Sequence, residues 1–209
     1  MDEKKKEILE KTLEIFHSFG IRSVSMDDVA KELRISKKTL YQYVENKSDL
    51  VEQTFRYQSS KNNDFMENVS NSNRNAIDVL LEISKWMHDE LSRITPQLSF
   101  DLNKYYPEMF QKLFNEKRQH IYEKIKANIE QGIQEGLFRT DLNVELISSL
   151  YMKKIEDLHE PDGLICNHDF SFKTIFNVMF DNHIRGIANE KGIAYYEENK
   201  KNLKLNEKI

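Results

Sequence analysis

The sequence predicts an all-α protein, and three observations lead to that class. Long stretches repeat apolar residues at every third or fourth position, which is the spacing of one helix face. The 209 residues include only six glycines and three prolines, too few for the many turns of a β protein. Two short segments near the N-terminus carry strong helix-start signals. With 39% hydrophobic and 32% charged residues, the chain can bury a core.

The first helix is predicted from Lys4 to Phe19. Its apolar residues, among them Ile8, Leu9 and Phe16, fall on one face, and Gly20 suits the position that follows a helix C-terminus. This face should pack on the two short helices that come next, which gives a three-helix core.

The first short helix is predicted from Met26 to about Leu33. Ser25 is a suitable N-cap, and Asp28 stands three residues later, as a capping box requires. Only Arg34 and Ile35 separate this helix from the next N-cap, Ser36. A tight link between two short helices is typical of a helix-turn-helix, whereas the alternative is an ordinary helical hairpin within a core.

The second short helix, which begins after Ser36, is polar and cationic on one side. Leu40 and Val44 lie four residues apart and should face inward. The outward-facing residues of its first turns are Lys37, Lys38, Thr39 and Gln42, which can bond to phosphates or base edges. We therefore interpret this helix as a DNA-reading element.

The charge is distributed in agreement with that interpretation. The whole chain has a net charge of -4, yet residues 31–47 hold five cations and two anions. A local basic patch can attract the DNA backbone, while acidic residues elsewhere limit indiscriminate binding to polyanions.

The N-terminal residues also resemble a known family. The runs at 25–33, 35–41, 43–44 and 46–50 (SMDDVAKEL, ISKKTLY, YV and NKSDL) look like the DNA-binding domain of TetR-family transcriptional regulators, without gaps. Arg34 stands where the family usually has Gly, and Val44 where it usually has Phe. A residue other than glycine at positive φ costs about 1 kcal/mol, so we expect a strained turn at Arg34.

The resemblance implies a helix-turn-helix DNA-binding domain over residues 1–47 and a larger helical ligand-binding and dimerisation domain over residues 48–209. It implies a transcriptional regulator, most often a repressor, which binds a near-palindromic operator on double-stranded DNA as a homodimer. The family pattern places Lys37, Lys38, Thr39 and Gln42 near base edges and Ser25, Tyr41, Tyr43 and Lys47 at phosphates, and either lysine of the pair 37–38 could serve in either role.

Further helices are predicted along the rest of the chain. The fourth starts after Asn46 and extends to about Val69, and the polar segment 70–75 reads as a linker. A fifth runs from Ala76 to about Arg93 and a short sixth from Gln97 to Lys104. Pro107, suited to the first turn, opens a seventh that continues to Gly136.

The eighth and ninth predicted helices, 144–158 and 172–187, are more apolar than one packing face needs. Two such helices fit an isologous four-helix interface between two subunits, as in the family. The residues predicted at this dimer interface are Ile147, Tyr151, Ile155, Phe172, Phe176, Met179, Phe180, His183 and Ile187. The loop 159–167 separates the two helices, and residues 190–209 form a charged tail that is frayed or helical.

The family usually holds a small-molecule effector among helices four to eight. The candidate ligand-binding residues there are Phe55, Phe65, Met66, Trp86, Met87, Phe100, Tyr105, Met109, Phe110, Phe114 and Tyr151. They indicate an apolar or aromatic ligand. The alternative for each residue is that it only fills the core, in which case the same DNA-binding dimer works without a small-molecule effector.

A metal-dependent helical-bundle enzyme is the rival from another class. Glu156 and His159 form one E-x-x-H, and Glu116 and His120 lie four residues apart, but a di-iron site needs that motif on two helices. We therefore expect no enzyme, no catalytic residue, no metal and no cofactor. The single Cys166 suits a reducing cytoplasm, and the sequence contains neither a signal peptide nor an apolar run long enough for a membrane span.

Overall fold

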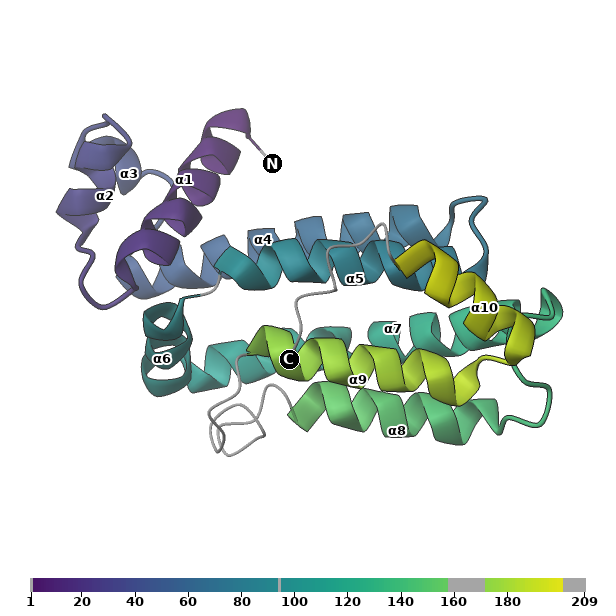
Figure 1. The fold of residues 1–209 in the computed structure, drawn as a ribbon. Helices are drawn as coiled ribbons and strands as arrows, with labels where there is room; N and C mark the ends of the chain where they lie inside the picture. The colour runs from purple at the N-terminus through teal and green to yellow at the C-terminus, as the bar shows by residue number, and fades with distance from the viewer. Residues whose placement is uncertain (1, 94, 158–171, 201–209) are drawn as a thin grey trace. The chain divides into compact units, whose positions relative to one another are not determined.

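The computed structural model describes residues 2–93, 95–157 and 172–200 and has ten helices in that part of the chain (Figure 1). The chain divides into two compact units. The N-terminal unit consists of Met1–Phe65 and Arg93–Glu116, and the C-terminal unit of Met66–Ser92 and Lys117–Ile209. The all-α class predicted from the sequence is confirmed.

The N-terminal unit starts with three helices: α1 (Glu3–Phe19), α2 (Met26–Glu32) and α3 (Lys37–Leu40). The first turns of α4 (Lys47–Ser70) follow. Apolar residues from all four helices form one buried cluster, in which Ile8, Phe16 and Leu40 are fully buried. This cluster is the three-helix core that the apolar stripe of the first helix predicts, closed by the start of α4.

Helix α6 (Pro96–Tyr105) belongs to the same unit, although it is separated from α3 by more than fifty residues of sequence. Thr95 caps it, because its side chain accepts a hydrogen bond from the N–H of Leu98. Leu98 and Leu102 are buried in the cluster formed by α1 to α4. The core of the N-terminal unit therefore includes a helix from the middle of the chain.

The C-terminal unit is built from the rest of α4, α5 (Ala76–Arg93), the rest of α7 (Pro107–Gln134), α8 (Val144–Asp157), α9 (Phe172–Ile187) and α10 (Glu190–Asn199). Two side chains contact the N-terminus of α5: the carboxylate of Glu135, just after α7, accepts the N–H of Ala76, and Asn128 of α7 donates to the Ala76 carbonyl. A second buried cluster joins α5, α7, α8, α9 and α10.

Most predicted helices appear within one or two residues of their expected bounds. Residues 190–199, in the part of the chain for which the sequence allows either a frayed or a helical tail, form α10. Asn189 caps this helix, because its side-chain oxygen accepts the N–H of Gly192. Cys166, the loop 159–167 and the tail 201–209 lie outside the described residues. No helix in the described ranges is both long and apolar enough to cross a membrane.

Candidate nucleic-acid interface

The start of α2 is fixed by the capping box that the sequence predicts. The N–H of Asp28 donates to Ser25 Oγ at 3.2 Å, and the N–H of Ser25 donates to Asp28 Oδ2 at 2.8 Å. Ser25 Oγ donates to the same carboxylate oxygen at 2.5 Å. These bonds from Ser25 hold the pKa of Asp28 below its ordinary value. The Asp28 carboxylate is therefore ionised at neutral pH and can accept both hydrogen bonds of the capping box, although this end of the helix is exposed.

Helix α3 is short, but both of its ends are defined. Ser36 Oγ accepts the N–H of Thr39 at 3.0 Å, and its hydroxyl lies 2.8 Å from the Thr39 hydroxyl. The backbone continues into a turn after Leu40, with the N–H of Val44 bonded to the Leu40 carbonyl. Leu40 and Val44 are buried, as predicted, so the apolar side of α3 is anchored in the core.

The other side of α3 is exposed at Lys37 and Lys38, and Thr39 is half-buried. The helix ends at Leu40, earlier than the sequence indicates, so Gln42 is exposed in the turn that follows and not on the helix itself. Lys37 makes an ion pair of 2.5 Å with Asp27 of α2, and both side chains are more than half exposed. Such a pair contributes little to stability, and the ammonium group can exchange Asp27 for a phosphate at small cost.

Four further residues were predicted at phosphates: Ser25, Tyr41, Tyr43 and Lys47. Ser25 and Tyr41 are exposed, whereas Tyr43 is half-buried and packs against the N-terminal core. Lys47 is half-buried in the first turn of α4, and its Nζ donates to the Arg22 carbonyl at 3.3 Å. Burial lowers the pKa of Lys47, and the negative charges of Asp101 and Asp28 act in the opposite direction.

The turn between α2 and α3 has the geometry expected from the Arg34 position. Arg34 is the one residue other than glycine with positive φ in the described part of the chain, at 54°. Its N–H still bonds to the Lys31 carbonyl at 3.0 Å, so the turn keeps its hydrogen bond. The helix-turn-helix therefore forms with a residue in the conformation that glycine adopts most easily.

The residues predicted at a dimer interface lie mostly inside the C-terminal unit. Tyr151, Phe176, Met179, Phe180, His183 and Ile187 are buried within one chain, and Ile147 and Ile155 pack against the same cluster. Phe172 begins α9, and its side chain lies outside the described part. Since these side chains already pack within their own chain, little of their surface is left for a partner.

A different face of α8 and α9 carries the exposed apolar residues. Leu146 and Leu150 are each 54% exposed and lie four residues apart on α8, and Val178 of α9 is 41% exposed. Sequence reasoning missed them because both sides of α8 are apolar, and the helical period alone does not say which side faces the core. The neighbours Glu145, Ser149 and Lys153, which are polar, were the available signal.

The predicted ligand-binding residues are divided between the two units. Phe55 and Met109 pack against the N-terminal core, while Phe100 and Tyr105 of α6 are exposed. In the C-terminal unit, Met87 packs against the core cluster, and Tyr151 is buried and stacked on His183. Phe65, Met66, Trp86 and Phe114 are half-buried, and the side chain of Phe110 lies outside the described part.

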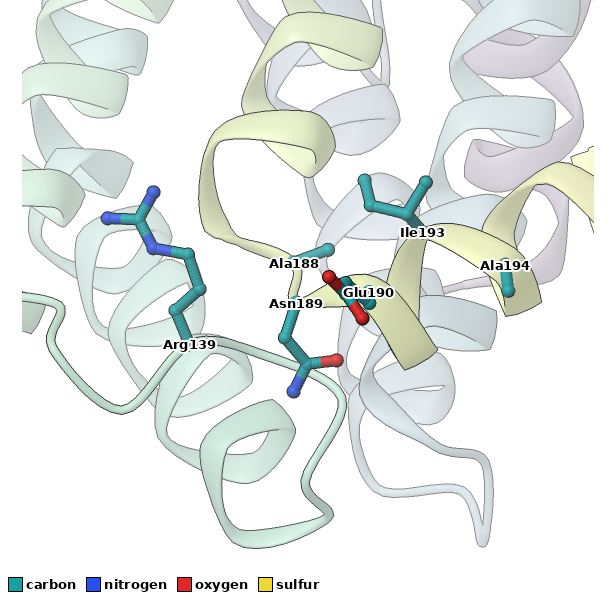
Figure 2. Close-up of a pocket in the computed structure, with 6 residues that line it drawn as sticks. All are labelled: Arg139, Ala188, Asn189, Glu190, Ile193 and Ala194. Carbon is teal, nitrogen blue, oxygen red and sulfur yellow. The ribbon is translucent and has the colours of Figure 1, made fainter.

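The C-terminal unit has a shallow surface hollow of about 590 Å³ where α10 begins (Figure 2). It is lined by Arg139, Ala188, Asn189, Glu190, Ile193 and Ala194. Both ends of the Asn189 side chain already have partners: its oxygen caps α10, and its NH₂ group donates to the carbonyls of Gly136 and Phe138. None of the predicted ligand-binding residues lines this hollow.

The acidic and histidine residues of the rival enzyme hypothesis are engaged in ion pairs. Glu116 binds Arg56, His120 lies 3.1 Å from Glu67, and Glu156 binds Arg118. His159 lies outside the described residues. Among the residues that the structure describes, no group of three or more His, Cys, Asp and Glu side chains is arranged to hold a metal ion.

A capped helix-turn-helix that presents an exposed cationic helix face defines a DNA-binding protein. Comparison with known proteins agrees with this class. Residues 8–54 match the model described as "Bacterial regulatory proteins, tetR family". The chain is 27% identical over 166 residues to the uncharacterized HTH-type transcriptional regulator YhgD of Bacillus subtilis, covering 74% of this chain and 84% of that protein.

Solved structures show the same fold over most of the chain. A transcriptional regulator of Saccharomonospora viridis in complex with choline has a TM-score of 0.66 and 19% identity, covering 91% of this chain and all of that one. The regulator FadR of Bacillus subtilis in complex with stearoyl-CoA has a TM-score of 0.59 and 18% identity, covering 87% and 98%. Residues 8–54 therefore form a DNA-binding domain of the TetR family, and the rest of the chain shares the fold of these regulators.

Proposed function

We propose that this protein is a repressor that binds a near-palindromic operator as a homodimer and is released by a small apolar or aromatic ligand. The observation that carries the DNA-binding part is α3 with the turn after it, where Lys37, Lys38 and Gln42 are exposed while Leu40 and Val44 are buried. The buried pair fixes the helix, so the exposed side chains can enter a major groove without rearrangement of the core.

The dimeric state is supported by the exposed leucines of α8. A surface with Leu146, Leu150 and Val178 exposed loses free energy when a second copy covers it. Two-fold symmetry of the protein requires two-fold symmetry of the operator, with recognition helices about 34–36 Å apart in successive major grooves.

Selection of bound fragments from the organism's genomic DNA tests this function. The wild-type protein should enrich fragments that share an inverted repeat, because two identical α3 helices read the two half-sites. A Gln42→Ala variant should enrich the same sites with relaxed preference at particular bases, since it keeps both lysines. Enrichment without any inverted repeat would contradict the proposed dimeric recognition.

The ligand part is supported by the relatives and by composition. The Saccharomonospora viridis regulator binds choline, and FadR of Bacillus subtilis binds stearoyl-CoA. In the C-terminal unit, Met66 of α4 and Trp86 of α5 are half-buried and are the predicted residues that an apolar molecule would contact there. A ligand that prefers the arrangement unable to bind DNA by about 2–3 kcal/mol shifts the equilibrium roughly thirty- to a hundred-fold.

We infer that α4 transmits this preference, since its first turn holds Lys47 and its last turn belongs to the C-terminal unit.

A panel of apolar and aromatic compounds, added to the protein bound to its selected duplex, tests whether a small-molecule effector exists. An effector should release the duplex and raise the melting temperature of the free protein.

A DNA-binding dimer without a small-molecule effector is the second candidate. The packing of Phe55, Met87 and Tyr151 in the cores of their units favours it, because those side chains already have partners within the chain. If no compound in the panel changes either DNA release or melting temperature, this second function is the better description.

A further inference from the structure

The turn between α1 and α2 is held by residues from two later helices. The N–H of Arg22 donates to Asp101 Oδ2 of α6 at 2.8 Å, and the carbonyl of Arg22 accepts from Lys47 Nζ of α4 at 3.3 Å. Both backbone polar groups of Arg22 are therefore bonded to charged side chains. All of these residues belong to the N-terminal unit.

Asp101 is fully buried, and its two oxygens are satisfied by the chain itself. Oδ2 accepts the Arg22 N–H, and Oδ1 accepts the amide of Gln97 at 2.9 Å. A buried carboxylate is costly unless it is hydrogen-bonded, and this one has donors on both sides. Gln97 and Asp101 pack closely against the backbone at Gly20, which leaves no room for a side chain there. A Cβ at this position would lie 2.7 Å from Gln97 Cγ and 2.9 Å from Asp101 Oδ2.

The end of α6 strengthens the same connection. The Arg22 guanidinium donates to the Tyr105 hydroxyl at 2.7 Å and lies 5.3 Å from the centre of that ring. Tyr106, which caps α6, packs against the buried cluster of the N-terminal unit. Helix α6 therefore contacts the turn before α2 and the core beneath it.

We propose that Asp101 is a positioning residue for DNA binding: it fixes the Arg22 backbone, which in turn orients the Lys47 ammonium group. The inference rests on the proposed phosphate contact of Lys47. Ser25, another predicted phosphate contact, lies three residues after Arg22, so the same fixed turn also sets the entry of α2.

Removal of the Asp101 carboxylate should weaken DNA binding. Without the carboxylate, the N–H of Arg22 and the amide of Gln97 lose their acceptor, and the turn relaxes. The Arg22 carbonyl then no longer stands where Lys47 can bond to it, and the ammonium group becomes free to adopt other rotamers. The Asp101 charge also acts to keep Lys47 protonated, against the effect of burial on its pKa.

A double-mutant cycle in the full chain tests the proposal. Affinity for the selected duplex is measured at one salt concentration for wild type, Asp101→Leu, Lys47→Ala and the double variant. Asp101→Leu should weaken binding about tenfold, and in the Lys47→Ala background the same change should cost less than about twofold. Asp101→Asn keeps an oxygen for the Arg22 N–H and should restore affinity to within about threefold of wild type.

Asp64→Leu is the matched control, since Asp64 is an exposed carboxylate of the same unit and its loss changes the net charge equally. If Asp101→Leu does not fold, Gln97→Leu replaces it in the cycle, because it removes the donor that holds Asp101 Oδ1. It should show the same non-additivity with Lys47→Ala.

Additive losses in either cycle would overturn the inference while leaving the DNA-binding function intact. So would an unchanged affinity of Asp101→Leu. Absence of salt-dependent binding by the wild-type protein would instead refute the proposed function, and this inference with it.

Discussion

A single residue, Arg34, carries backbone strain in the helix-turn-helix. Its φ of 54° lies in the left-handed region, and its side chain is exposed. Replacing it with glycine removes the steric cost of the side chain but gives the unfolded chain more freedom, and the two effects are each about 1 kcal/mol. We expect Arg34→Gly to be as stable as wild type or slightly more stable in urea unfolding.

Arg34→Val is the matched comparison at the same position. A β-branched side chain is poorly accommodated at positive φ, so this variant should lose more than about 1 kcal/mol. If Arg34→Gly were clearly destabilised instead, the arginine side chain would have to stabilise the turn through its own contacts.

Lys47 is the residue that we expect to contact a phosphate of the DNA backbone. A lysine that contacts a phosphate contributes to affinity but not to sequence preference. Lys47→Ala should therefore weaken binding to all duplexes by a similar factor and lower the slope of log affinity against log salt by about one. Titrations at several salt concentrations measure both quantities. A loss confined to certain sequences would mean that Lys47 reads bases.

At the scale of an element, α3 depends on its N-cap. It has four residues, which is too short for the helix to persist through its own hydrogen bonds. Ser36→Ala removes the acceptor for the Thr39 N–H and should cost about 1 kcal/mol of stability. DNA affinity should fall by more than the unfolded fraction accounts for, whereas Ser60→Ala, at an exposed position of α4 in the same unit, should leave affinity near wild type.

The packing of α8 on α9 gives a pH-dependent stability. His183 stacks on Tyr151 with ring centres 3.7 Å apart, and burial, assisted by the charge of Lys154, lowers the pKa of His183 to about 4. The folded state thus holds a neutral imidazole, whereas the unfolded chain protonates near pH 6.5. The free energy of unfolding therefore falls as the pH drops from about 6.5 toward 4, because the unfolded chain takes up a proton that the folded state does not. The total loss from this group is about 3 kcal/mol, and none of it occurs above about pH 6.5.

His183→Phe preserves a stacked ring and removes the titration. Its unfolding free energy should change less than that of wild type between pH 7 and pH 4, at one fixed protein concentration. Equal slopes for the two proteins would show that His183 is not held neutral in the fold.

Helix positions were predictable because their signals are local. Ser25, Ser36, Pro107 and Gly20 act within a few residues of where they stand, so α1 to α3 and the start of α7 follow from the sequence. The direction in which a helix faces depends on distant partners. Asp101 reads as a surface residue of a short helix until α6 is seen to pack on the turn at Arg22.

The same limit applied to α8. Ile147 and Tyr151 lie one position away from Leu146 and Leu150, and both pairs have helical spacing. Only the packing of the whole C-terminal unit decides that Tyr151 is buried and Leu150 exposed. Sequence reasoning therefore placed α8 and α9, but it did not show which of their apolar residues stay exposed in the single chain.

At the scale of the whole molecule, two subunits must act together for the proposed recognition of a palindrome. Joining two DNA-binding units makes the second binding event intramolecular, which raises affinity by about 10²-fold or more. Leu150→Glu places a charge on the exposed apolar face of α8 and should shift the protein from dimer to monomer in sedimentation experiments. Affinity for the full operator should then fall by about that factor, while affinity for a single half-site stays unchanged.

Phe19→Glu adds the same charge at an exposed aromatic residue of the N-terminal unit and should leave the dimer intact. A Leu150→Glu protein that remains dimeric would place the subunit contact on another surface.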